Sequence, residues 1–182
     1  MSFSGLLTAL AEYVGDVLVN DCGRPIPDRV LRYHGVIPDD CCTDAGTLAV
    51  SWVIGTASST FGTGLAAAPA DPCVSMPTYT VAIRYRVCWP LPEAEGPLLD
   101  PQWDETAAML ADTADCVTRA LAALACEARS PGDADPLMEA VWAMLSRRQW
   151  LRLVDVSASV PLGGCAGVVW RLLVAPRAGA AS

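Results

Sequence analysis

The sequence predicts an α+β domain with helices packed on one face of a largely antiparallel sheet. Three segments repeat apolar residues at helical spacing, and three segments alternate as strands do. The apolar run GVVWRLLV follows a Gly-rich turn and is expected to be a fourth strand. Their order along the chain is helix, strand, strand, helix, helix, strand, strand, and this segregation is typical of α+β folds. A length of 182 residues fits one domain, spanning 1–182.

The first part of the chain predicts a helix followed by an irregular arm. Apolar residues recur at three- and four-residue spacing over about residues 3–19, which places them along one side of a helix. The segment from about 20 to 46 is rich in Pro, Gly and Asp, which favours irregular structure. We expect at most one short strand within this arm, near Val30 to Tyr33.

Two strands flank a long irregular segment. Alternating residues predict strands at about 47–54 and 78–89. Between them, about residues 55–75 carry no charge until Asp71 and consist mostly of Gly, Ala, Ser, Thr and Pro. A loop of this length is uncommon inside a compact domain and is usually functional. We expect this loop to become ordered against a partner.

The strand at 78–89 has two chemically different sides. Its odd-numbered residues are Tyr, Val, Ile, Tyr, Val and Trp, which predicts that this side faces the core. The other side carries Arg84 and Arg86. These arginines either lie on a solvated sheet face or form ion pairs between subunits, for which the rigid planar guanidinium is well suited.

The strongest helical pattern opens the second half of the chain. Asp100 suits the N-cap and Pro101 the first helical position, while Asp104 and Glu105 place negative charge in the first turn, where the helix dipole favours it. Apolar residues then repeat in steps of four and three as far as Leu124.

A shorter helix and a hairpin complete the domain. The helix is expected from about Pro136 to Arg148, and strands at about 153–160 and 167–174 are joined by a Gly-rich turn. The Ala- and Gly-rich tail at 176–182 is predicted to be frayed.

Composition predicts an acidic protein that buries apolar surface against other subunits. Twenty acidic and twelve basic residues, all Arg, give a formal charge of −8, which disfavours a nucleic-acid binder. The hydrophobic fraction is 53%, yet no apolar run reaches the roughly 18 to 20 residues of a membrane span. We see no secretory signal and expect synthesis in the cytoplasm. The excess apolar surface predicts oligomerisation.

The cysteines show none of the paired spacings of a zinc site, so no metal is expected. They are Cys22, Cys41, Cys42, Cys73, Cys88, Cys116, Cys126 and Cys165. We expect them to start as reduced thiols that act mostly as small buried hydrophobic residues, and a released particle could oxidise some of them later. Cys116 and Cys126 cannot pair on one helix, because ten residues span about 15 Å.

The sequence predicts no catalytic and no cofactor-binding residues. His34 is the only histidine and the only conventional base for a cysteine nucleophile, but a packed or solvated histidine is the simpler interpretation. Phosphate-binding, dinucleotide-binding and hydrolase-elbow motifs are missing. The acidic pairs Asp39–Asp40 and Asp133–Asp135 lie in turn segments, where carboxylates are usually solvated or cap helices.

Four short stretches carry a resemblance to a known family. They are the DCC turn at Asp40 to Cys42 before LAVSWVIG, the strand TYTVAIRYRVCWP, the helical ML-D-ADCVTRAL and the closing PLGGCAGVVWRLLV. Together they resemble the tail terminator proteins of long-tailed, siphovirus-type phages that infect actinobacteria, over about residues 40–175. The loop from 55 to 75 has no counterpart in that resemblance.

The resemblance implies a structural virion protein without enzymatic activity. Such subunits form a homo-oligomeric ring, typically a hexamer, at the head-proximal end of the tail. There the ring ends polymerisation of the tail tube protein and presents a surface to the head-completion or neck protein. DNA would pass through the channel without specific binding, and an acidic channel would repel its phosphates. Neither a cofactor nor a membrane is implied.

Closing such a ring requires two different surfaces of the subunit to meet. We expect a sheet edge and the 55–75 loop to supply these surfaces. Arg84 and Arg86 are the candidate ion-pair donors, and Phe61 and Leu65 are the candidate apolar contacts of the loop.

Three alternatives remain at this stage. The first is a head-to-tail connector or stopper protein of the phage neck. The second is a small thiol-dependent enzyme, which needs an exposed, unusually acidic cysteine near His34. The third is a carrier of apolar ligands, suggested by six Trp, although Trp more often anchors cores and interfaces.

Overall fold

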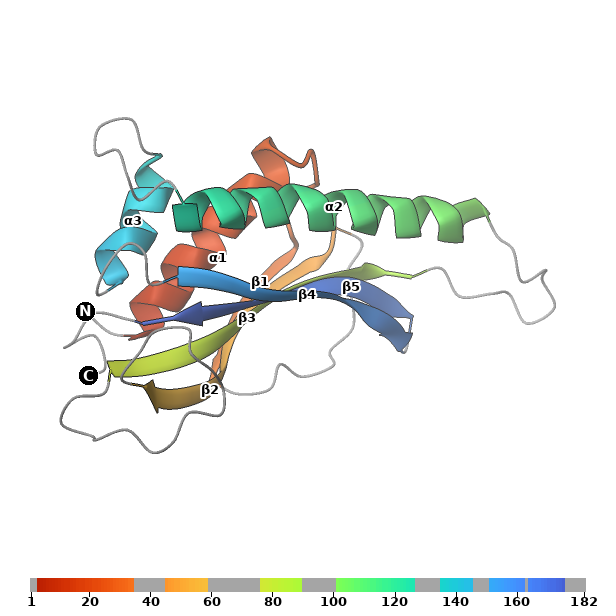
Figure 1. Cartoon of the computed structure of the whole chain (residues 1–182). Helices are drawn as coiled ribbons and strands as arrows, with labels where there is room; N and C mark the ends of the chain where they lie inside the picture. The colour runs from red at the N-terminus through yellow and green to blue at the C-terminus, as the bar shows by residue number, and fades with distance from the viewer. Residues whose placement is uncertain are drawn as a thin grey trace.

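A single layer of helices covers one face of a mixed sheet in the computed structural model (Figure 1). The structure describes residues 3–34, 45–58, 76–89, 101–126, 135–145, 151–162 and 164–175. Within these ranges there are three helices and five strands. The predicted α+β class, with helices on one face of a mostly antiparallel sheet, is confirmed.

The helices are α1 (Phe3–Asn20), α2 (Pro101–Cys126) and α3 (Pro136–Met144). Helix α3 begins at a complete N-cap, because the Asp135 carboxylate accepts a hydrogen bond of 2.7 Å from the backbone nitrogen of Leu137. The same helix ends earlier than position 148, since Leu145 is already extended. The expected cap of α2, Asp100, lies outside the described residues.

The strands are β1 (Arg29–His34), β2 (Thr47–Ser58), β3 (Met76–Cys88), β4 (Leu151–Leu162) and β5 (Cys165–Val174). Their order in the sheet is β1-β2-β3-β5-β4, so β3 is central and β1 and β4 are the outer strands. Only the β1–β2 pair is parallel; β2–β3, β3–β5 and β4–β5 are antiparallel. The expected β4–β5 hairpin is therefore confirmed.

The one short strand expected in the arm, near Val30 to Tyr33, is confirmed, because residues 29–34 pair along β2. The end of β2 differs from the expected boundary. Strand β2 extends to Ser58, four residues into the expected loop, because Gly55 to Ser58 pair with residues 79–76 of β3. Cross-strand pairing here outweighs the weak strand propensity of this Gly- and Ser-containing segment. Residues 59–75 and the tail at 176–182 lie outside the described residues.

The core lies between the helices and the sheet. Its members without any exposed surface are Leu10, Val14, Leu18, Leu48, Val50, Val81, Ile83, Val117, Leu121, Leu124, Val141, Trp170, Leu172 and Val174. The expected inward side of β3 is confirmed, because Val81, Ile83, Tyr85 and Val87 are all buried. Burial raises the pKa of the Tyr85 hydroxyl, an effect that the positive charge of Arg24 partly opposes.

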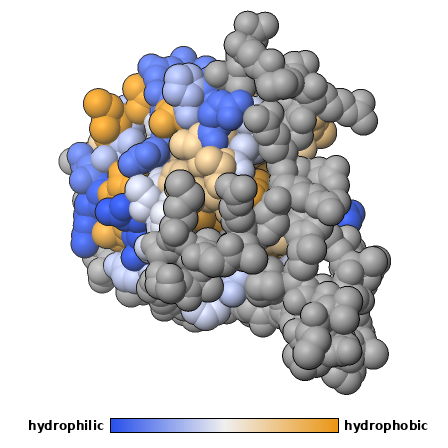
Figure 2. All heavy atoms as spheres, turned by 90° about the vertical axis from the view of Figure 1, so that its left-hand side faces the viewer, coloured by the Kyte–Doolittle hydropathy of each residue, from blue (hydrophilic) through white to orange (hydrophobic). Residues whose placement is uncertain are grey.

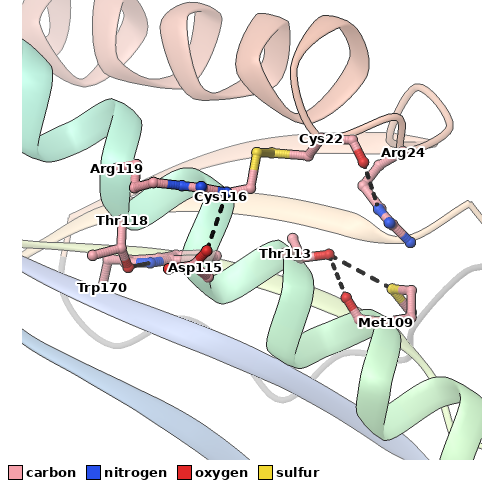
Figure 3. Close-up of a disulfide and its surroundings, with 9 residues drawn as sticks. All are labelled: Cys22, Arg24, Met109, Thr113, Asp115, Cys116, Thr118, Arg119 and Trp170. Atoms are coloured by element: carbon pink, nitrogen blue, oxygen red, sulfur yellow. Dashed lines mark hydrogen bonds and ion pairs between the residues drawn. A yellow bond between two sulfur atoms is a disulfide. The ribbon is translucent and has the colours of Figure 1, made fainter.

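Two buried tryptophans fix the helices against each other and against the sheet. The Trp142 indole nitrogen of α3 donates a hydrogen bond of 2.9 Å to the Leu124 carbonyl of α2. The Trp170 indole nitrogen of β5 donates to the Thr118 hydroxyl of α2 at 3.1 Å (Figure 3). Each indole thus contributes a large apolar surface and keeps its N–H satisfied.

A disulfide joins the end of α1 to the middle of α2. Cys22 is bonded to Cys116, with 5.8 Å between the two Cα atoms (Figure 3), and Cys165 is also disulfide-bonded. These three are oxidised, whereas we expected thiols that start reduced and of which some oxidise later. Cys22 and Cys116, 94 positions apart, meet because α1 packs beside α2. Cys88 and Cys126 are exposed, so these two are not the small buried residues expected of most cysteines, whereas Cys165 is buried.

Candidate functional site

Arg84 and Arg86 lie on the central strand β3, on the side of the sheet opposite the helices. Arg84 lies between Ala49 on β2 and Val169 on β5. Arg86 lies between Thr47 on β2 and Gly167 on β5. Both side chains are half-buried. Nε and Nη1 of Arg84 and Nε of Arg86 are buried from solvent. They are therefore not freely solvated. They lie on the face of the sheet opposite the helices, where Ala49, Ala82 and Val169 are buried as well, and not at an edge.

Gly167 creates the space that the Arg86 side chain occupies. A Cβ atom at Gly167 would lie 2.9 Å from Cγ of Arg86 and 2.2 Å from the carbonyl oxygen of Tyr85. Both distances are shorter than van der Waals contact permits, so only glycine fits between the two strands at this point. The aliphatic part of Arg86 thus lies across the β5 backbone.

Five of the described arginines share this face of the sheet. Strand register places Arg29, Arg84, Arg86, Arg152 and Arg171 on the same side, since paired residues point to the same face. The acid described on this side is Asp155, which forms an ion pair with Arg171. Nη1 of Arg171 also donates a hydrogen bond of 3.2 Å to the Ser157 hydroxyl. This face is therefore basic, although the whole chain is acidic.

The layer of helices carries the opposite charge. Helices α1, α2 and α3 together contain seven acidic residues and a single Arg: Glu12, Asp16, Asp104, Glu105, Asp112, Asp115, Glu139 and Arg119. Arg119 forms an exposed ion pair of 3.1 Å with Asp115, one turn away in α2. Among the described residues, the helices are thus acidic and the sheet face opposite them is basic. Such a separation of charge orients an approaching charged partner.

An apolar groove runs between α2 and the outer part of the sheet. Its volume is about 410 Å³. Its lining includes Trp89, Leu110, Ala114, Val156, Ala158 and Val168. Trp89 lines it, and the centroid of its ring lies 6.2 Å from that of Trp103. The groove is open to solvent along β4.

The large apolar side chains most exposed in the described residues lie at the two edges of the sheet. Ile26 and Val30 are 74% and 48% exposed at the β1 edge, and Val154 and Val156 are 55% and 37% exposed on β4. The exposure of Val154 and Val156 was not predictable, because a hairpin sequence does not reveal which of the two strands, β4 or β5, is the outer one. At the end of the molecule where α3 lies, hydrophobic and hydrophilic residues are intermixed (Figure 2).

His34 and Cys88 do not form the site that the thiol-enzyme alternative needs, and Cys41, Cys42 and Cys73 lie outside the described residues. His34 pairs with Trp52, which pairs with Val81 on β3. Cys88 lies seven residues farther along β3, roughly 23 Å away at about 3.3 Å per residue. This separation is too large for a histidine to activate that thiol.

The remaining candidates are placed only in part. Asp135 caps α3, as expected for an acid in a turn. Phe61, Leu65, Asp39, Asp40 and Asp133 lie outside the described residues. Among the described residues, no cluster of three or more His, Cys, Asp or Glu could hold a metal ion, and no helix is long and apolar enough to cross a membrane.

No protein-family model matches the chain, and no curated protein matches it. The functional interpretation therefore depends on the surfaces described above and on the resemblance of short segments.

Proposed function

We propose that this protein is a tail terminator of a long-tailed phage, a structural subunit that forms a ring on the head-proximal end of the tail. The observation that supports this most is that the described part of the subunit has two unlike outer strands, β1 and β4, each with exposed apolar residues at its edge. A ring needs two different surfaces of this kind on every subunit. An isolated protein gains nothing from leaving them exposed.

The resembling segments occupy the framework of this fold. LAVSWVIG lies in β2, TYTVAIRYRVC in β3, the ADCVTRAL stretch in α2 and CAGVVWRLLV in β5. These elements form the centre of the sheet and the long helix that covers it. The resemblance therefore concerns the layout of the subunit, whereas both sheet edges lie in β1 and β4.

Charge and redox state agree with this role. A net charge of −8 disfavours adhesion of DNA phosphates to a ring through which the genome passes. The disulfide between Cys22 and Cys116 suits a particle that leaves the reducing cytoplasm. In this proposal the subunit is made in the host cytoplasm, and its partners are its own copies, the tail tube protein and the neck protein.

Tail length is the property that tests the function. Phage that lack this protein should assemble tails of variable and excessive length, and supplying the protein in trans should restore a uniform length in electron micrographs. Tails of normal length that fail to join heads would instead indicate a connector or stopper of the neck. Normal particles without the protein would contradict both roles.

A further inference from the structure

We propose that β4 of one copy pairs with β1 of the next copy, so that the sheet continues from subunit to subunit. This inference rests on the proposed ring and names the surfaces that form it. Outer strands expose unpaired backbone N–H and C=O groups, which makes them natural templates for another strand. In this protein the two outer strands are β1 and β4.

Strand directions favour this pairing. Strand β1 is parallel to β2, and each of the following neighbours, β2–β3, β3–β5 and β5–β4, is antiparallel. Strand β4 therefore runs opposite to β1. When the sheet continues into a similarly oriented neighbour, β1 of that neighbour meets β4 in an antiparallel arrangement, which is the slightly more stable type.

Exposed apolar residues mark both members of the proposed pair. Val30 pairs with the buried Leu48, and Val156 pairs with the buried Trp170, so both point to the helical side of their sheet. In a continuous sheet, Val30 of one copy and Val156 of the next then lie on the same side. There they are adjacent to the apolar groove beside β4, and contact removes both from water.

Charge is complementary across the same contact. At the β1 edge, Arg32 is exposed on the helical side of the sheet, whereas Arg29 lies on the opposite face. Helix α2, which packs over β4 and β5 (Figure 1), contains four exposed acids and one Arg. Arg32 at the β1 edge of one copy thus approaches the acidic helix above β4 of the next. A contact of β4 with β4 would instead bring two acidic helices together.

Single charge substitutions at the two edges test the pairing. Val30→Glu places a negative charge opposite the acidic α2, and Val156→Lys places a positive charge opposite the β1 edge that carries Arg32. Both positions are already exposed, so thermal unfolding should remain close to that of the wild type. Ala143→Glu and Ala143→Lys, at an exposed position of α3, are matched controls.

Sedimentation of the purified chain and mass analysis of chemically cross-linked tails are the measurements. We expect the wild type and both controls to assemble, and each edge variant to associate at least tenfold more weakly. An equal mixture of the two edge variants should form species that contain both chains. The Val30→Glu chain keeps an intact β4, and this strand can pair with the intact β1 of the Val156→Lys chain.

Three outcomes would overturn the pairing. Assembly of both edge variants at wild-type strength would exclude the edges. Loss of assembly by Val156→Lys alone would indicate two-fold β4–β4 contacts. A wild-type chain that is monomeric in solution and on tails would exclude any pairing. The proposed function is tested independently of the pairing. If rings form through both edges but do not limit tail length, the terminator role is contradicted and the pairing of β4 with β1 still holds.

Discussion

At position 167 two strands approach so closely that a side chain on β5 would collide with the backbone of β3. The Arg86 side chain passes over this glycine, so the geometry of the basic face depends on it. The alternation of residues 78–89 predicted that Arg84 and Arg86 share one side of their strand, because strand geometry fixes this. Their partial burial was not predictable, since burial depends on strands that are distant in sequence.

Replacing Gly167 by Ala should lower the free energy of unfolding by about 2 to 3 kcal/mol, because the added Cβ forces β3 and β5 apart. Urea unfolding of the purified protein measures this. Gly15→Ala is the matched control: its Cβ would meet Leu48 at an ordinary 3.7 Å, so helix propensity should raise stability by about 0.5 to 1 kcal/mol. Similar effects of both substitutions would contradict the close approach at position 167.

The double substitution of Arg84 and Arg86 by Ala should weaken assembly at low salt more than it weakens folding. Ion pairs between subunits are screened as salt rises, so the difference from the wild type should shrink at high salt. Sedimentation and urea unfolding, measured together, separate the two effects. Arg119→Ala, which removes an exposed ion pair within α2, serves as the control. Equal losses of assembly and stability would count against an interface role.

Among the elements, local signals predicted the helices better than the sheet edges. Asp135 followed by Pro136 marked the start of α3 correctly, because capping involves only neighbouring residues. The position of β4 at the edge follows from the insertion of β5 between β3 and β4. A hairpin sequence does not state which of its strands joins the existing sheet, so the exposure of Val154 and Val156 was missed.

The disulfide between Cys22 and Cys116 should contribute strongly to stability. It closes a segment of 94 residues, and the loss of chain entropy on unfolding corresponds to about 4 to 5 kcal/mol in the simplest treatment. Replacing both cysteines by Ser should therefore lower the midpoint of urea unfolding markedly under oxidising conditions. In the presence of reductant, the variant and the wild type should become nearly equal. Equal stability under oxidising conditions would show that the bond does not constrain the unfolded chain.

On the scale of the whole molecule, composition predicted an oligomer but not its geometry. The 53% hydrophobic content indicated apolar surface in need of a partner, and the structure places the most exposed part of it, among the described residues, at two opposite sheet edges. The net charge of −8 did not reveal that, among the described residues, the helices carry mostly acids and the sheet face opposite them carries five Arg. The position of the exposed apolar residues and the distribution of charge both arise from strand order and register. Strand order and register depend on contacts between residues far apart in the sequence, so they could not be predicted from local patterns.

We propose that copies of this chain close into a ring. The native mass of the purified protein, together with end-on electron micrographs of the same sample, tests this. We expect a closed ring with a central opening and a mass close to six times the subunit mass of 19.1 kDa. A single subunit mass, both in solution and in assembled tails, would contradict it.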